Sequence, residues 1–79
     1  MLTKITFRID KVRPDEANRI IDTREPRGLF YVVGKLDGQT VYTGIDNWDG
    51  NAWTEDFKSL STCKRWLEGK CIQRNNLVW

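Results

Sequence analysis

The dipeptide Asp37-Gly38, set between two runs of β-forming residues, constrains the fold of this chain more than any other feature. A type I′ turn needs positive φ at both of its central residues, and Asp-Gly meets that need well. Residues 29–36 and 39–46 are therefore predicted to form an antiparallel hairpin. Its register would pair Val32 with Thr43, Phe30 with Ile45 and Gly34 with Val41.

This register gives the hairpin two unlike faces. The predicted core face carries Phe30, Val32, Leu36, Val41 and Ile45, and the mixed face carries Tyr31, Val33, Lys35 and Tyr42. A second turn follows at residues 47–51, where Gly50 suits the left-handed conformation. Residues 52–57 are then predicted to return as a third strand. Pairing Trp53 with Ile45 and Phe57 with Val41 would add both aromatic side chains to the core face.

A helix is predicted over residues 60–68, capped by Ser59 or Ser61 and ended by Gly69. Its apolar stripe is the natural cover for the core face of the sheet. That stripe consists of Leu60, Cys63, Trp66 and Leu67. Alternation over residues 4–9 predicts a further strand at an edge of the sheet. Residues 10–22 fit either a helix that begins at Pro14 or an excursion into a short strand, and residues 70–79 fit either a last strand or a tail.

These elements predict the α+β class, as a three- to four-stranded antiparallel meander with one C-terminal helix packed on one face. With 79 residues and no linker or repeat, residues 1–79 are expected to be one small domain. The first residues contain no apolar run long enough for a signal peptide, and no segment is apolar enough to cross a membrane. The expected location is therefore the cytoplasm.

Composition argues against an enzyme. The chain has no histidine, which excludes histidine-based catalysis and histidine metal ligands. Cys63 lies on the apolar stripe and is predicted to be a buried, inert thiol. An EF-hand loop with Gly50 in its sixth place would have Ile45 first, where an oxygen ligand is required. We therefore expect no metal, no cofactor and no small-molecule substrate, and the Asp and Asn side chains of this loop should stabilise a turn.

The charges are divided along the chain. Residues 36–57 carry five carboxylates and no Lys or Arg, and all 13 basic residues lie in the rest of the chain. Trp48 stands in this acidic stretch, at the tip of a polar turn. An aromatic anchor ringed by polar groups is typical of a protein interface. The predicted partner-binding residues are Asp46, Trp48, Asp49 and Asn51. The alternative is that Trp48 folds back beside Tyr31 or Tyr42.

A second hypothesis is nucleic-acid binding by an arginine-rich segment. Its candidate residues are Arg13, Arg19, Arg24, Arg27 and Lys64. Such residues track phosphates when they converge on one side of a domain. However, Asp15, Glu16, Asp22 and Glu25 are interleaved with them, and the pI of 8.7 is below the value of about 9 typical of nucleic-acid domains.

Several short motifs resemble a family of small uncharacterised proteins from Gram-positive bacteria and their phages. They are residues 21–26, 28–31, 44–47 and 50–57, with Cys63 and the pair Trp66-Leu67. The resemblance spans roughly residues 20–68, and the run Ala-Trp-Thr-Glu-Asp-Phe at 52–57 is its most specific part. It implies the setting of a phage or mobile-element accessory protein and no activity. The expected function is non-catalytic binding of a host or viral macromolecule, such as inhibition of a host system, with a protein as the first choice of partner and nucleic acid as the second.

Overall fold

The computed structural model describes residues 8–76 and the side chains of residues 8–69. Within them the elements follow in the order β1 (Ile9–Val12), α1 (Pro14–Thr23), β2 (Gly28–Leu36), β3 (Gln39–Asn47), β4 (Trp53–Phe57) and α2 (Leu60–Asn76). The strands form one sheet in the order β1-β2-β3-β4. The α+β class is confirmed, but the sheet is mixed, because β1 runs parallel to β2 while the other neighbours are antiparallel.

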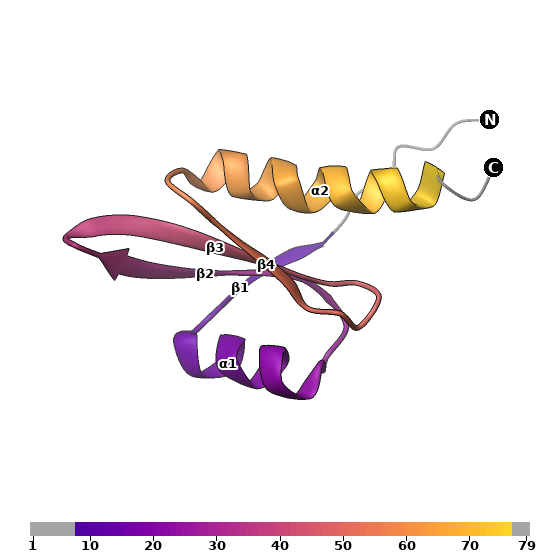
Figure 1. The fold of residues 1–79 in the computed structure, drawn as a ribbon, viewed down its shortest axis with the longest axis horizontal. Helices are drawn as coiled ribbons and strands as arrows, with labels where there is room; N and C mark the ends of the chain where they lie inside the picture. The colour runs from indigo at the N-terminus through magenta and orange to yellow at the C-terminus, as the bar shows by residue number, and fades with distance from the viewer. Residues whose placement is uncertain (1–7, 77–79) are drawn as a thin grey trace.

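The two helices cover opposite faces of the sheet (Figure 1). This corrects the expectation of one helix on one face. Helix α1 covers the predicted core face, where Ala17 and Ile20 pack with Phe30 and Ile45. Helix α2 covers the face predicted to be mixed. There Cys63 and Leu67 pack with Leu29, and Tyr31, Tyr42, Phe57 and Trp66 lie around them.

The β2–β3 hairpin has the predicted register. Val32 pairs with Thr43 and Phe30 with Ile45, and the turn residues Asp37 and Gly38 both have positive φ, at 52° and 79°. The tip of the hairpin extends beyond both helices (Figure 1). Leu36 lies at this tip and is 64% exposed, so its placement in the core was wrong. Neither helix extends far enough to cover it.

Residues 10–22 contain a helix, which resolves the two alternatives. Pro14 occupies the first turn of α1, where its missing N–H costs nothing, and the Arg13 N–H donates to Glu16 Oε1 at 3.0 Å. The acidic first turn also complements the helix dipole. The edge strand predicted at residues 4–9 is displaced: the edge strand β1 spans Ile9–Val12, shares only Ile9 with the prediction and leaves Arg8 outside. Residues 4–7 lie outside the described residues.

Strand β4 is shifted by one residue from the predicted pairing. Trp53 pairs with Asp46 and Phe57 with Tyr42, in place of Ile45 and Val41. Because side chains alternate along a strand, this shift moves Trp53 and Phe57 from the α1 side of the sheet to the α2 side. Phe57 contacts Trp66 there, with ring centroids 5.6 Å apart.

Helix α2 begins where the sequence predicts and ends later. Ser59 caps it, since the Thr62 N–H donates to Ser59 Oγ at 3.3 Å. The helix continues through Gly69 to Asn76, so residues 70–76 are neither a strand nor a tail, and residues 77–79 lie outside the described residues. None of the helices in residues 8–76 combines the length and the apolar character needed to cross a bilayer.

Cys63 is completely buried on the sheet side of α2. Burial raises the pKa of its thiol from 9.0 to about 11, although the charge of Lys64 acts in the opposite direction. The thiol is therefore protonated at neutral pH, and the predicted buried thiol is confirmed.

Close packing between α2 and β3 depends on a glycine. A Cβ added at Gly44 would lie 3.0 Å from Trp66 Cζ3 and 3.2 Å from Cys63 Sγ, whereas a Cβ at Gly34 would meet nothing within 4 Å. We expect Gly44→Val to lower the free energy of unfolding by about 1–3 kcal/mol, because it overpacks the α2 side of the core.

The matched control is Gly34→Val, in the exposed part of β2. Valine favours strands, so this variant should keep or raise the stability of the parent chain. Urea denaturation measures both variants. Equal stabilities would contradict the close approach of α2 to β3.

Candidate functional site

The β3–β4 loop, residues 48–52, lies beyond the paired ends of β3 and β4. Gly50 and Ala52 both adopt positive φ, at 87° and 51°. Two carboxylates stabilise the turn as the sequence predicts: Asp46 Oδ1 accepts from the Trp48 N–H and Asp49 Oδ1 accepts from the Asn51 N–H, both at 3.2 Å. The loop therefore has a defined backbone conformation before any partner binds.

Two arginines from the α1–β2 connection brace this loop. Arg24 Nη1 donates to the carbonyl oxygens of Gly50 and Asn51, at 3.2 and 3.1 Å. The Arg27 guanidinium lies against Gly50 so closely that a Cβ there would be 2.9 Å from its Cζ. Asn47 Nδ2 adds a third link by donating to the Pro26 carbonyl at 2.8 Å. Together these contacts join the loop to the end of α1.

The loop is flanked by two exposed indoles. Trp48 is 44% exposed and Trp53 is 51% exposed, and Asp49 and Asn51 are exposed between them. We call Trp48, Asp49, Asn51 and Trp53 the loop surface. Trp53 was missed by sequence reasoning, which placed it in the core through the wrong register.

Asp46 does not belong to this surface. Asp46 is completely buried, so the prediction that it contacts a partner was wrong. The alternation along β3 places its side chain on the α2 side, opposite Trp53 in the sheet. Asp46 supports the loop from inside through its bond to the Trp48 N–H.

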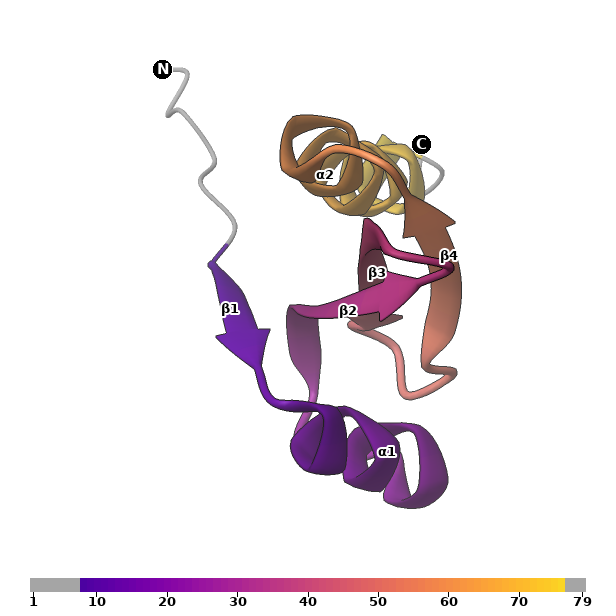
Figure 2. The same cartoon turned by 90° about the vertical axis from the view of Figure 1, so that its left-hand side faces the viewer.

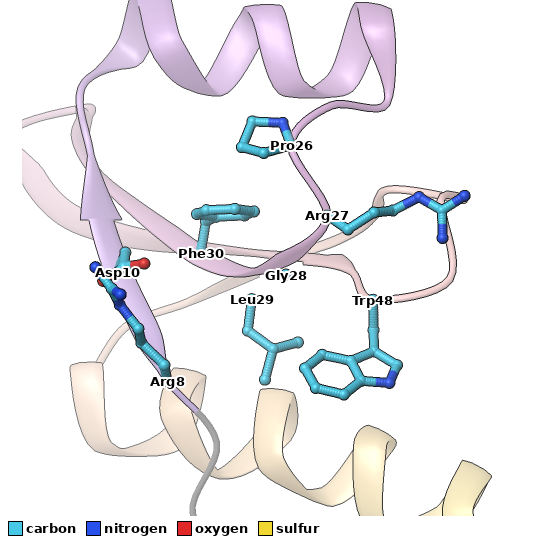
Figure 3. Close-up of a pocket in the computed structure, with 8 residues that line it drawn as sticks. All are labelled: Arg8, Asp10, Pro26, Arg27, Gly28, Leu29, Phe30 and Trp48. Atoms are coloured by element: carbon cyan, nitrogen blue, oxygen red, sulfur yellow. The ribbon is translucent and has the colours of Figure 1, made fainter.

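Beside the base of the loop, an open hollow of about 520 Å³ separates Trp48 from β1. In Figure 3 the Trp48 indole lies next to Leu29, and Arg8 and Asp10 lie on the opposite side. Arg8 is paired with Asp10 at 3.0 Å, and Arg27 extends away from the hollow toward the loop. The polar groups of the hollow therefore point away from one another, whereas those of a small-molecule site converge on the ligand.

The basic residues of the nucleic-acid hypothesis are dispersed. Arg13 contacts Asp15 and Glu16, at 3.7 and 3.6 Å, and Arg24 and Arg27 hold the loop. Lys64 projects from α2, on the other face of the sheet from α1, with Nζ 6.0 Å from the Tyr31 ring centroid. Arg19 is exposed on α1. The structure does not bring the five residues together on one surface.

Among the side chains of residues 8–69, no three acidic or cysteine groups lie closely enough together to hold a metal ion. In comparisons with known proteins, the chain matches no protein-family model, no curated protein and no solved structure.

The arginine brace generates a prediction. Arg24→Ala removes two hydrogen bonds to the carbonyls of Gly50 and Asn51, and we expect a loss of about 1–2 kcal/mol in stability. Amide hydrogen exchange of residues 48–53 should accelerate, because the loop opens more readily. Arg19→Ala is the matched control on α1 and should change stability by less than about 0.5 kcal/mol. Unchanged exchange in Arg24→Ala would show that the brace does not hold the loop.

Proposed function

We propose that this chain is a small non-catalytic binding domain that docks on another protein through its loop surface. The observation that carries the proposal is a pair of large, half-exposed indoles held on a braced loop. Tryptophan is enriched among the residues that contribute most to protein binding. A loop that is already ordered loses little conformational entropy on association, which favours affinity.

The acidic charge of residues 36–57 supports a basic partner surface, with Arg24 and Arg27 held against the backbone of the loop. Residues 36–57 contain Asp37, Asp46, Asp49, Glu55 and Asp56 and no Lys or Arg. Four of these carboxylates are exposed, and Asp46 is the exception. Complementary charge accelerates encounter and excludes partners of the wrong sign. A protein partner is favoured over nucleic acid, whose phosphates carry the same sign as this region.

The biological setting follows from the resemblance to small proteins of Gram-positive bacteria and their phages. On that ground we propose an accessory protein of a phage or mobile element that acts in the cytoplasm on a host or viral protein. Inhibition of a host system is the role that fits a domain of this size with no catalytic step of its own.

The loop surface is tested by Trp48→Ala. The parent chain is immobilised, and proteins captured from a bacterial lysate are quantified by mass spectrometry. We expect Trp48→Ala to reduce capture of the specific partner at least 10-fold, as for a residue at the centre of an interface. Its melting temperature should stay close to that of the parent, because the side chain is half exposed.

The matched control is Ile21→Ala, which truncates an exposed apolar side chain on α1. It should retain full capture. Equal losses in both variants, or a collapse of the melting temperature in Trp48→Ala, would contradict the assignment of the loop surface.

A further inference from the structure

Strand β4 forms one border of the sheet, and no described strand pairs with its outer side. Figure 2 shows β4 at the opposite border from β1. A border strand presents backbone N–H and C=O groups that can pair with an added strand. Residues 53–56 are exposed and Phe57 is half buried, so the strand is accessible along its length.

The two borders differ in how they are protected. Strand β1 carries the exposed cation Lys11 and is followed at once by Arg13 and Pro14. Charged side chains, lysine above all, and proline are the usual devices that prevent pairing at a sheet edge. The sequence of β4, Trp-Thr-Glu-Asp-Phe, contains neither Lys nor Pro, and three of its five residues are good strand formers. The charged residues of β4 are both carboxylates, Glu55 and Asp56, so its outer edge disfavours acidic strands and stays open to a basic one.

The side chains of β4 carry a specific charge pattern. Trp53, Glu55 and Phe57 lie on the α2 side of the sheet, and Thr54 and Asp56 lie on the α1 side. Asp56 accepts the Thr43 hydroxyl at 2.6 Å, and neither Asp56 nor Glu55 has an ion pair within the described part of the chain. An added strand with a basic residue on each face would neutralise both carboxylates.

A second copy of this chain fits the edge poorly. The antiparallel register that uses all five residues places Glu55 opposite Glu55 of the other copy. Like charges directly opposite in a sheet are destabilising. The pattern therefore selects a basic segment of a different protein.

A hollow next to the end of β4 also favours a basic side chain. It has a volume of about 340 Å³. Its walls include the apolar side chains Leu36, Val41 and Phe57 and the carboxylates Asp37 and Asp56, with Lys58 as its one cation. A long basic side chain packs its methylene groups on apolar walls while its charged head reaches a carboxylate. A Lys or Arg one residue beyond the added strand would fit here.

We propose that the partner docks as an extended basic segment that adds an antiparallel fifth strand to the outer edge of β4. This inference rests on the proposed function and names the kind of segment that is bound. The segment carries adjacent basic residues opposite Glu55 and Asp56, apolar residues opposite Trp53 and Phe57, and a Lys or Arg that enters the hollow beside Asp37. Backbone pairing supplies affinity and the side chains supply selectivity.

The test uses a defined probe, the peptide acetyl-Lys-Val-Lys-Arg-Thr-Val-Thr-amide, titrated into the labelled full chain up to about 5 mM, a range that detects weak binding. We expect amide shifts centred on residues 53–57 and slower amide exchange at alternate residues of β4. Methylating the peptide nitrogens that face β4, or replacing Lys and Arg by Glu, should abolish these shifts. Glu55→Lys should weaken binding at least 10-fold, and Asp15→Lys on α1 should leave it unchanged.

The inference is overturned if residues 53–57 do not respond, if the methylated peptide binds equally well, or if sedimentation shows a dimer that Glu55→Lys dissociates, because a second copy then occupies the edge. The two proposals fail separately. Loss of partner capture in Trp48→Ala without any response of β4 retains the proposed function and rejects the added strand. A response of β4 with unchanged capture in Trp48→Ala retains the added strand at β4 and rejects the loop surface as the docking site.

Discussion

The guanidinium of Arg24 holds two consecutive backbone carbonyls of the β3–β4 loop. The conformation of this loop sets the register in which β4 pairs with β3. The loop closes with Asp46 opposite Trp53. A slip of one residue would turn every side chain of β4 to the other face of the sheet. The register therefore determines both what α2 packs against and what the domain exposes.

On the inner side, this register brings Phe57 to Trp66, while Gly44 leaves the space that the Trp66 ring needs. The same register exposes Trp53 beside the loop and places Glu55 on the α2 side and Asp56 on the α1 side of the sheet. The register of β4 thus connects the core under α2 with the loop surface and with the edge of β4. The proposed functions of these two regions depend on it equally.

What could be predicted from the sequence was local. The Asp37-Gly38 turn fixes the hairpin through the backbone preferences of two adjacent residues, and the cap at Ser59 acts within one helical turn. The exposure of Trp48 was not decided by the sequence, which also allowed the indole to fold back beside Tyr31 or Tyr42; in the structure it is 44% exposed. The β4 register was not predictable in this way, because it involves a left-handed Ala52 and an arginine 26 residues before Gly50.

The second helix layer was missed for a related reason. Helix α1 is the crossover between the parallel strands β1 and β2, and its position on the sheet depends on their pairing, which joins residues 20 apart in sequence, such as Ile9 and Leu29. In the candidate site, the same non-local packing buries Asp46 and exposes Trp53, which reverses the roles expected for both. At Gly69 a local signal was misleading: glycine often ends helices, but here α2 continues through it to Asn76.

The register of β4 is tested most directly by cross-strand backbone proton contacts measured by NMR in the unmodified chain. The account predicts contacts that join Ile45 with Thr54 and Thr43 with Asp56. Contacts that join Ile45 with Trp53 and Val41 with Phe57 would contradict it, because Trp53 would then lie under α1 and the loop surface would not exist.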